Sequence, residues 1–166
     1  IMDLIRLDGG SIEVLGKPWN TLTARDKQEI GVVFPGYAFS GCLTVKQLIP
    51  VLAGLYEKFD RGRFLSYCER FGLPMGQKTK EFSTGMRAKL KLLSVLSYSP
   101  RILILDEPTS GLDVVARDGL LDLLREHMRE DRAILVSSHI SSDLEGFCDD
   151  IYMIDGGRII LHEDTD

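Results

Sequence analysis

The chain has 166 residues, of which 44% are hydrophobic and 27% charged, the composition of one soluble globular domain with its own core. Its net charge of −5 argues against a protein whose main task is to bind nucleic-acid phosphates. Its three cysteines include no Cys-x-x-Cys pair, so neither a disulfide framework nor a zinc site is expected. No run approaches the ~18 apolar residues of a membrane span, and the first residues lack the pattern of a signal peptide.

The first part of the chain predicts small strands and turns. Residues 11–15 alternate towards a strand, and turns are expected at residues 7–10 and 16–18. The apolar run Ile30–Phe34 predicts a buried strand that ends at Pro35 and Gly36. From residue 43 to residue 97 the apolar residues recur at helical spacing.

After residue 100, continuous apolar strands alternate with helices. Ile102–Leu105 and Ala133–Val136 predict two buried strands, each followed by a helix, and Asp113 is placed to cap the first of these helices. Two last strands flank a turn at Gly156 and Gly157. This alternation predicts an α/β core whose sheet is covered on both faces, with chemistry gathered beyond the carboxyl ends of the strands.

Three polar residues follow those strand ends. Asp106 could hold Mg²⁺ through an oxygen ligand, and Glu107 could polarise a water molecule for attack on phosphorus. His139 could donate a hydrogen bond to a terminal phosphate oxygen. The ordinary alternatives are an acidic turn after a strand and a structural histidine.

A second candidate segment precedes the helix that ends near residue 97. Ser83 is placed to cap this helix, whose first turn has free N–H groups, and Gly85 has no side chain to block an approaching anion. Taken alone, the segment is an ordinary helix cap followed by a glycine.

The order of the motifs is more specific than any one of them. Ser83-Thr-Gly-Met86, an apolar strand ending in Asp106-Glu-Pro108, Ser110-Gly-Leu-Asp113 and Ser137-Ser-His139 follow one another along the chain. In this order they resemble the signature motif, Walker B, D-loop and switch histidine of the ATP-binding cassette (ABC) ATPases. The form of the first segment is similar to that of bacterial exporters of the ABC-2 type.

The resemblance implies the P-loop NTPase fold of ABC ATPases, with a parallel core sheet, a small antiparallel β region and a helical subdomain. It divides the single domain 1–166 into a β region and strand (1–36), a helical subdomain with the signature motif (37–97) and a core with the last strands (98–166). The implied cofactors are ATP and Mg²⁺. The implied partners are a second ABC ATPase subunit and a transmembrane permease. Through the permease the subunit would lie on the cytoplasmic face of the membrane. No nucleic acid is expected as a partner.

The resemblance also implies a role for each site residue. Asp106 would hold Mg²⁺, Glu107 would act as the general base and His139 would contact the γ-phosphate. Four signature residues would cap the nucleotide of the opposite subunit: Ser83, Thr84, Gly85 and Met86. Asp113 would signal across the dimer.

The sequence departs from the family pattern in two places. The phosphate loop Gly-x-x-x-x-Gly-Lys-Ser/Thr does not occur in residues 1–166, so these residues are expected to begin just downstream of it and to bind ATP weakly. Pro35 stands where the family usually has a glutamine that contacts the metal and the attacking water and links to the helical subdomain. Proline has neither a side-chain hydrogen-bonding group nor an N–H to replace it.

The missing loop also has a structural consequence. In the family fold its strand lies between those resembling Ala133–Val136 and Ile151–Ile154, so a chain of these residues alone is expected to fail to fold, to re-pair its strands or to associate. Two other functions stay open: a non-transport ABC ATPase, and a catalytically silent partner or fragment that presents its signature face to a competent subunit.

Overall fold

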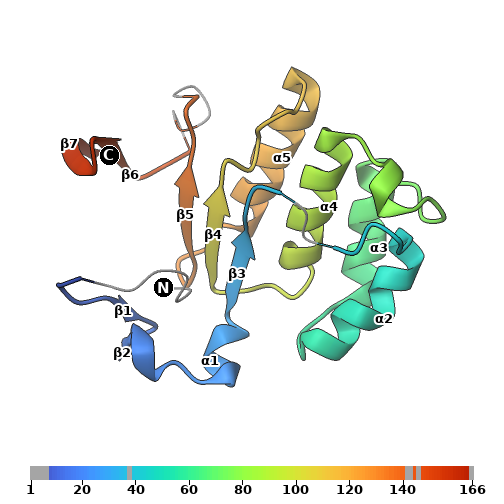
Figure 1. Cartoon of the computed structure of the whole chain (residues 1–166), viewed down its shortest axis with the longest axis horizontal. Coiled ribbons are helices and arrows are strands. Elements are labelled where there is room, and N and C mark those ends of the chain that lie inside the picture. The colour runs from blue at the N-terminus through green and yellow to red at the C-terminus, as the bar shows by residue number, and fades with distance from the viewer. Residues whose placement is uncertain (1–7, 37–38, 141–143, 145–146, 165–166) are drawn as a thin grey trace.

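A three-stranded parallel sheet forms the centre of the fold (Figure 1). The computed structural model describes residues 8–36, 39–140, 144 and 147–164. Strand β4 (Ile102–Asp106) lies between β3 (Ile30–Val33) and β5 (Ala133–Ser137). The parallel sheet, the flanking helices and the small antiparallel pairs agree with the α/β fold predicted from the sequence.

The helices lie beside the sheet and build the core. Helix α4 (Thr84–Leu96) packs next to β3, and α5 (Val114–His127) contacts α4 (Figure 1). Helices α2 (Val45–Leu55) and α3 (Arg61–Arg70) lie on the outer side of α4 (Figure 1). Helices α2, α3 and α4 all fall between residues 43 and 97, where the sequence predicts helices. None of the helices in the described ranges is long and apolar enough to cross a bilayer.

Close packing joins α4 to the sheet through a glycine of β3. A Cβ atom added at Gly31 would lie 2.3 Å from Val95 Cγ1 of α4 and 2.8 Å from Leu103 Cδ2 of β4. The strand can approach the helix this closely because no side chain stands between them. The end of β3 is thereby set beside the helix that begins at Thr84.

The first antiparallel pair corrects one prediction. Strands β1 (Glu13–Val14) and β2 (Lys17–Pro18) are joined by a two-residue turn at Leu15 and Gly16, both with positive φ. The turn expected at residues 16–18 is therefore wrong, because Lys17 pairs with Val14 and belongs to a strand. A short helix, α1 (Ala24–Lys27), and two single 3₁₀ turns (Trp19–Thr21 and Thr79–Glu81) are also present.

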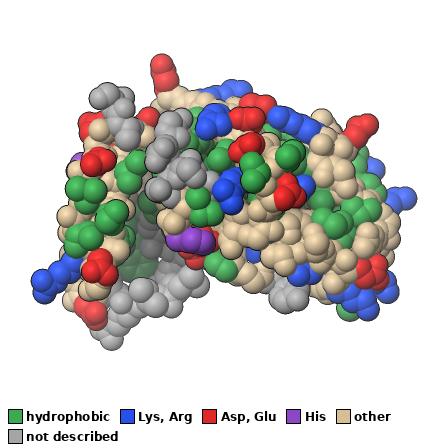
Figure 2. Space-filling view, turned by 90° about the horizontal axis from the view of Figure 1, so that it is seen from above, with side chains coloured by type: hydrophobic (Ala, Val, Ile, Leu, Met, Phe, Trp, Pro, Cys, Tyr) green, Lys and Arg blue, Asp and Glu red, His purple; other side chains and the backbone are tan. Residues whose placement is uncertain are grey.

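The last two strands form a separate hairpin. Strands β6 (Asp150–Asp155) and β7 (Arg158–Asp164) pair with each other through the predicted turn, where Gly156 and Gly157 have φ of 53° and 77°. Hydrophobic side chains appear on the surface at the side of the molecule where this hairpin lies (Figure 2). Six large hydrophobic residues of the hairpin are exposed: Tyr152, Met153, Ile154, Ile159, Ile160 and Leu161.

The expectation of a sheet covered on both faces is wrong for β5. In this strand exposed and half-buried residues alternate, and Leu135 is 60% exposed. Among the described residues β5 pairs with β4 alone and β6 with β7 alone, so β5 is an edge strand there. The helix expected after β5 falls mainly on residues 141–143 and 145–146, outside the described ranges.

Candidate active site

The carboxyl ends of β4 and β5 bring polar groups together, because parallel strands end at the same edge of a sheet. Asp106 is the last residue of β4 and is paired in register with Ser137, the last residue of β5. The Ser137 hydroxyl donates a 2.6 Å hydrogen bond to Asp106 Oδ1. This bond fixes the orientation of the carboxylate at the strand end.

Glu107 leaves the strand in an unusual conformation. Its φ is +48°, in the left-handed region, where a residue with a side chain is under strain. Its N–H donates to Ser137 O at 3.2 Å and to Ser137 Oγ at 3.1 Å, which holds this conformation. Ser137 therefore organises both acidic residues, a role that sequence reasoning missed.

His139 lies directly beside Glu107. Its Nδ1 is 2.7 Å from Glu107 Oε2, and the imidazole is 70% exposed while the glutamate side chain is 27% exposed. Glu107 Oε2 is itself shielded from solvent and has no aligned hydrogen bond within the described residues, so the imidazole is its polar neighbour there. The structure thus brings together the three groups that the sequence placed after the two strands.

The donor set at this point fits a small, hard cation. Asp106 offers carboxylate oxygens, and its hydrogen-bond partner Ser137 offers a hydroxyl. No group of three or more His, Cys, Asp or Glu side chains suited to a metal occurs among the described residues. The carboxylate of Asp106 fits Mg²⁺ because this ion is usually bound by one or two carboxylates, while water and substrate phosphates complete its shell.

The signature segment forms the start of α4. Ser83 caps the helix, and its Oγ accepts a 3.1 Å hydrogen bond from Met86 N. Thr84 is the first residue of the helix, and Ser83 and Thr84 are exposed. A Cβ at Gly85 would lie 3.1 Å from Leu112 Cδ2, so the glycine allows the loop after β4 to pack against the signature segment.

Asp113 caps the next helix, as predicted. Its Oδ1 accepts a 2.9 Å hydrogen bond from Ala116 N at the start of α5. Gly111, two residues earlier, has a φ of 75°, and a Cβ there would lie 3.0 Å from Thr84 Cγ2. The Ser110–Asp113 loop therefore connects the acidic strand end to the signature segment within one chain.

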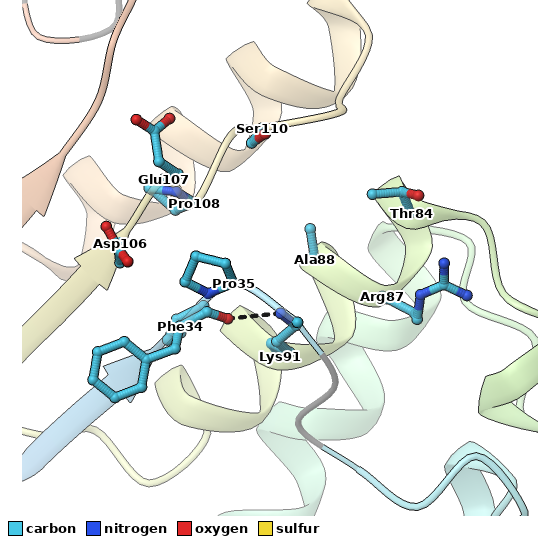
Figure 3. A pocket seen from close by; sticks show the side chains of 12 residues that line it. Phe34, Pro35, Thr84, Arg87, Ala88, Lys91, Asp106, Glu107, Pro108 and Ser110 are labelled. Atoms are coloured by element: carbon cyan, nitrogen blue, oxygen red, sulfur yellow. Dashed lines mark hydrogen bonds between the residues drawn. The ribbon is translucent and has the colours of Figure 1, made fainter. Parts of the chain in front are cut away.

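A pocket of about 400 Å³ lies between the end of β3, the end of β4 and one face of α4 (Figure 3). Of the predicted site residues, Asp106, Glu107 and Thr84 line this pocket. Ser83, Gly85, Met86, Asp113 and His139 are not among its lining residues.

Two cationic side chains of α4 line the same pocket, and sequence reasoning did not identify either as a site residue. They are Arg87 and Lys91. Lys91 Nζ donates a 2.7 Å hydrogen bond to the carbonyl oxygen of Phe34, next to Pro35 (Figure 3). Burial, followed by the positive charge of Arg87, lowers the pKa of Lys91 below its usual value.

The chain is similar in sequence to several known proteins. The model of a family described as "AAA domain, putative AbiEii toxin, Type IV TA system" matches residues 7–142. The ABC transporter ATP-binding protein NatA of Bacillus subtilis is 32% identical over 96% of this chain and 68% of its own length. The lantibiotic transport ATP-binding protein SrtF of Streptococcus pyogenes is 32% identical over 98% of this chain and 70% of its own length. Another ABC transporter ATP-binding protein, YtrB of Bacillus subtilis, is 34% identical in sequence over 74% of this chain and 42% of its own length.

Solved structures show the same fold. The structure of an ATP binding subunit of an ABC transporter covers all of this chain with a TM-score of 0.86 at 23% identity, over 71% of its own length. The dimeric ATP-binding cassette MJ0796, bound to ADP and Pi, covers 96% of this chain and 75% of its own with a TM-score of 0.82 at 20% identity. Given the order of its motifs and its relatives at 32% identity over most of its length, the chain belongs to the family of ABC transporter ATP-binding proteins.

Proposed function

We propose that this chain forms the ATP-hydrolysing part of an ABC transporter subunit that powers transport across a membrane. The observation that carries the proposal is the cluster of Asp106, Glu107 and His139 at the ends of two neighbouring strands. An acidic pair beside an imidazole can position a water molecule and a phosphate group for hydrolysis. The names of NatA and SrtF, which refer to transport, support the membrane role over a non-transport ATPase.

Each residue has a distinct part in this proposal. Asp106, oriented by Ser137, holds Mg²⁺, which when bound neutralises charge on the β- and γ-phosphates. Glu107 accepts the proton of the attacking water. His139 contacts Glu107 Oε2 through Nδ1. Because a carboxylate can only accept, Nδ1 carries a hydrogen in this contact, and Nε2 donates to a γ-phosphate oxygen as well only in the doubly protonated ring, in which both nitrogens are donors.

The signature segment serves a second subunit. The helix start is formed by Ser83, Thr84, Gly85 and Met86. The first two of these residues are exposed, so they can contact a nucleotide that is bound by a partner subunit. Asp113 ends the loop that packs on this segment, and it caps α5. A shift of the segment is therefore transmitted through Asp113 to α5. The dimeric state of the MJ0796 cassette supports a second ABC ATPase subunit as partner.

The membrane attachment is through a permease. The cbiO1 protein of Clostridium perfringens, whose structure matches with a TM-score of 0.73 at 23% identity, is part of the ABC transporter complex cbiONQ. We assign the helical region 43–97 as the surface for the permease, on the inner face of the membrane. The net charge of −5 favours neither DNA nor ribosome as a partner.

Residues 1–166 alone should not be a working ATPase. The phosphate-loop pattern, whose N–H groups and lysine bind the β- and γ-phosphates, does not occur in them. The chain spans between 42% and 70% of the length of the relatives named above. The tests below use the protein as it occurs naturally.

The decisive experiment is Glu107→Gln in the full-length protein. We expect turnover, followed by phosphate release, to fall by about 10²-fold or more, while ATP binding in an equilibrium titration stays unchanged, because only the base is removed. Glu130→Gln, the same change at an exposed residue remote from the strand ends, is the matched control. Undiminished hydrolysis in Glu107→Gln would refute the role of Glu107.

One alternative has an observation in its favour. Pro35 removes the glutamine contact of the family, which is what a catalytically silent partner could tolerate. A silent subunit would neither bind nor hydrolyse ATP as a full-length chain, yet would raise the turnover of a competent partner subunit. Measuring both quantities separates the two functions.

A further inference from the structure

A lysine of α4, the helix that begins with the signature segment and is called the signature helix below, binds the end of strand β3. Strand pairing between β3 and β4 stops at Val33, so the carbonyl of Phe34 lies beyond the ladder. Lys91 Nζ donates a 2.7 Å hydrogen bond to this carbonyl oxygen. Pro35 cannot supply one, because it has no N–H and no polar side-chain atom.

Lys91 lies on the face of α4 that lines the pocket, so its contact with Phe34 also affects the pocket. Thr84, Arg87, Ala88 and Lys91 all line the pocket, and their spacing of three and four residues puts them on one face of α4. The opposite wall of the pocket carries Asp106 and Glu107 (Figure 3). A movement of α4 therefore changes the width of the pocket at the acidic residues.

Both cations of this face donate to backbone carbonyls. Lys91 donates across the pocket to Phe34, and Arg87 donates through Nη1 to Phe82, at the entry to its own helix. The Lys91 ammonium is half-buried and carries three donors, of which one is used by Phe34 among the described residues. A hydrogen bond from a charged donor in such a place is stronger than one between neutral groups.

We infer that Lys91 is a positioning residue that ties the Phe34–Pro35 segment to the signature helix and so sets the pocket wall facing Asp106 and Glu107. The link runs from the helix that begins at Ser83 to the strand end where Pro35 stands, and it is made by a side chain of the helix to a backbone carbonyl. The contact itself is independent of the ATPase assignment, and only its effect on turnover rests on the proposed function.

Three substitutions test this link in the full-length protein. Lys91→Met removes the donor and keeps a flexible side chain that favours helix, while Lys91→Arg keeps a charged donor. Lys89→Met is the matched control, because Lys89 is a lysine of the same helix that does not line the pocket. If Lys91→Met does not fold, Lys91→Gln, which is polar but one bond shorter, replaces it in both measurements.

The first measurement does not depend on activity. Amide hydrogen exchange in the peptide covering residues 30–36 should become about tenfold faster in Lys91→Met, the size expected for loss of one hydrogen bond to a charged group. Lys91→Arg should restore protection, and Lys89→Met should leave it unchanged. Equal exchange in Lys91→Met and Lys89→Met would overturn the inference.

The second measurement separates positioning from general stability. In Lys91→Met we expect kcat to fall by about tenfold with KM changed less than about twofold, and Lys91→Arg to recover most of kcat, because orientation at the reacting groups is lost while binding is not. Unchanged kcat in Lys91→Met would refute the effect of Lys91 on the site. A full-length chain that shows no hydrolysis before any substitution would refute the proposed function instead, and the exchange measurement would still decide the Lys91 contact.

Discussion

Replacing His127 should flatten the dependence of stability on pH. His127 ends helix α5 and is 7% exposed. Nε2 lies 3.2 Å from the carbonyl oxygen of Pro100, and Nδ1 lies 2.9 Å from Arg132 Nη1. Since the guanidinium can only donate, Nδ1 must accept, and the hydrogen of the neutral ring resides on Nε2, where it donates to Pro100. A second proton on Nδ1 would face Arg132 directly.

These contacts determine the sign of the effect. Burial, followed by the charge of Arg132, lowers the pKa of His127 from 6.5 to about 4, and the more distant Arg63 and Arg129 act in the same direction. The folded protein thus binds this proton less readily than the unfolded chain. The stability contributed by the neutral ring is fully present above pH 6.5 and is lost as the pH falls from 6.5 to 4.

The magnitude follows from that difference in pKa. A displacement of this size corresponds to about 3 kcal/mol once both states have been titrated. Between pH 7.5 and pH 5 the loss is about 2 kcal/mol, because the unfolded histidine is then mostly charged and the folded one mostly neutral. This is a large part of the free energy of unfolding of a typical domain.

Equilibrium urea unfolding, followed by circular dichroism at pH 7.5 and at pH 5, measures this loss. His127→Gln keeps a polar side chain and removes the titrating ring, so it should lose about 2 kcal/mol less than the unsubstituted protein between the two pH values. Equal losses in His127→Gln and the unsubstituted protein would refute the reasoning.

Three further outcomes are expected from the packing. Gly31→Ala should lower the free energy of unfolding by about 1–3 kcal/mol in a urea titration, because the new Cβ would lie 2.3 Å from Val95 Cγ1; an unchanged midpoint would contradict this packing. Asp113→Ala should cost about 1 kcal/mol in the same titration through the lost cap of α5, and Asp113→Asn should recover most of it. A chain of residues 1–166 alone should elute above monomer size in size-exclusion chromatography with light scattering, and Ile160→Thr should shift it towards monomer; a monomer without the substitution would contradict an association through the exposed hairpin.

The core strands and the acidic cluster can be predicted from the sequence for one physical reason. Continuous apolar runs such as Ile102–Leu105 indicate buried parallel strands, and such strands end at a common edge. Residues directly after two neighbouring strands are therefore close in space, which is why Glu107 and His139 are found 2.7 Å apart. The helix caps at Ser83 and Asp113 are predictable because capping depends on residues three positions apart.

Other features depend on contacts that no local pattern encodes. The turn of the first hairpin escapes prediction because Leu15, a residue that rarely takes a positive φ, occupies half of it. The exposed face of β5 escapes prediction because apolar composition reports what a strand can bury, whereas burial depends on what lies against it. The contact of Lys91 has no sequence signature, because its partner, the Phe34 carbonyl, is a backbone atom 57 residues away.

The conformation of Glu107 separates the two carboxylates to which the proposed mechanism gives different tasks. If β4 continued in extended form, Glu107 would point to the opposite face from Asp106, because side chains alternate along a strand. Its φ of +48° ends the strand and turns its carboxylate towards His139, while Asp106 remains paired with Ser137 in the ladder. A left-handed residue with a side chain costs about 1–3 kcal/mol, and the two hydrogen bonds from Glu107 N to Ser137 offset that cost. In the proposed mechanism, one serine at the end of β5 thus orients the carboxylate that would bind Mg²⁺ and holds the neighbouring residue where its carboxylate would act as a base.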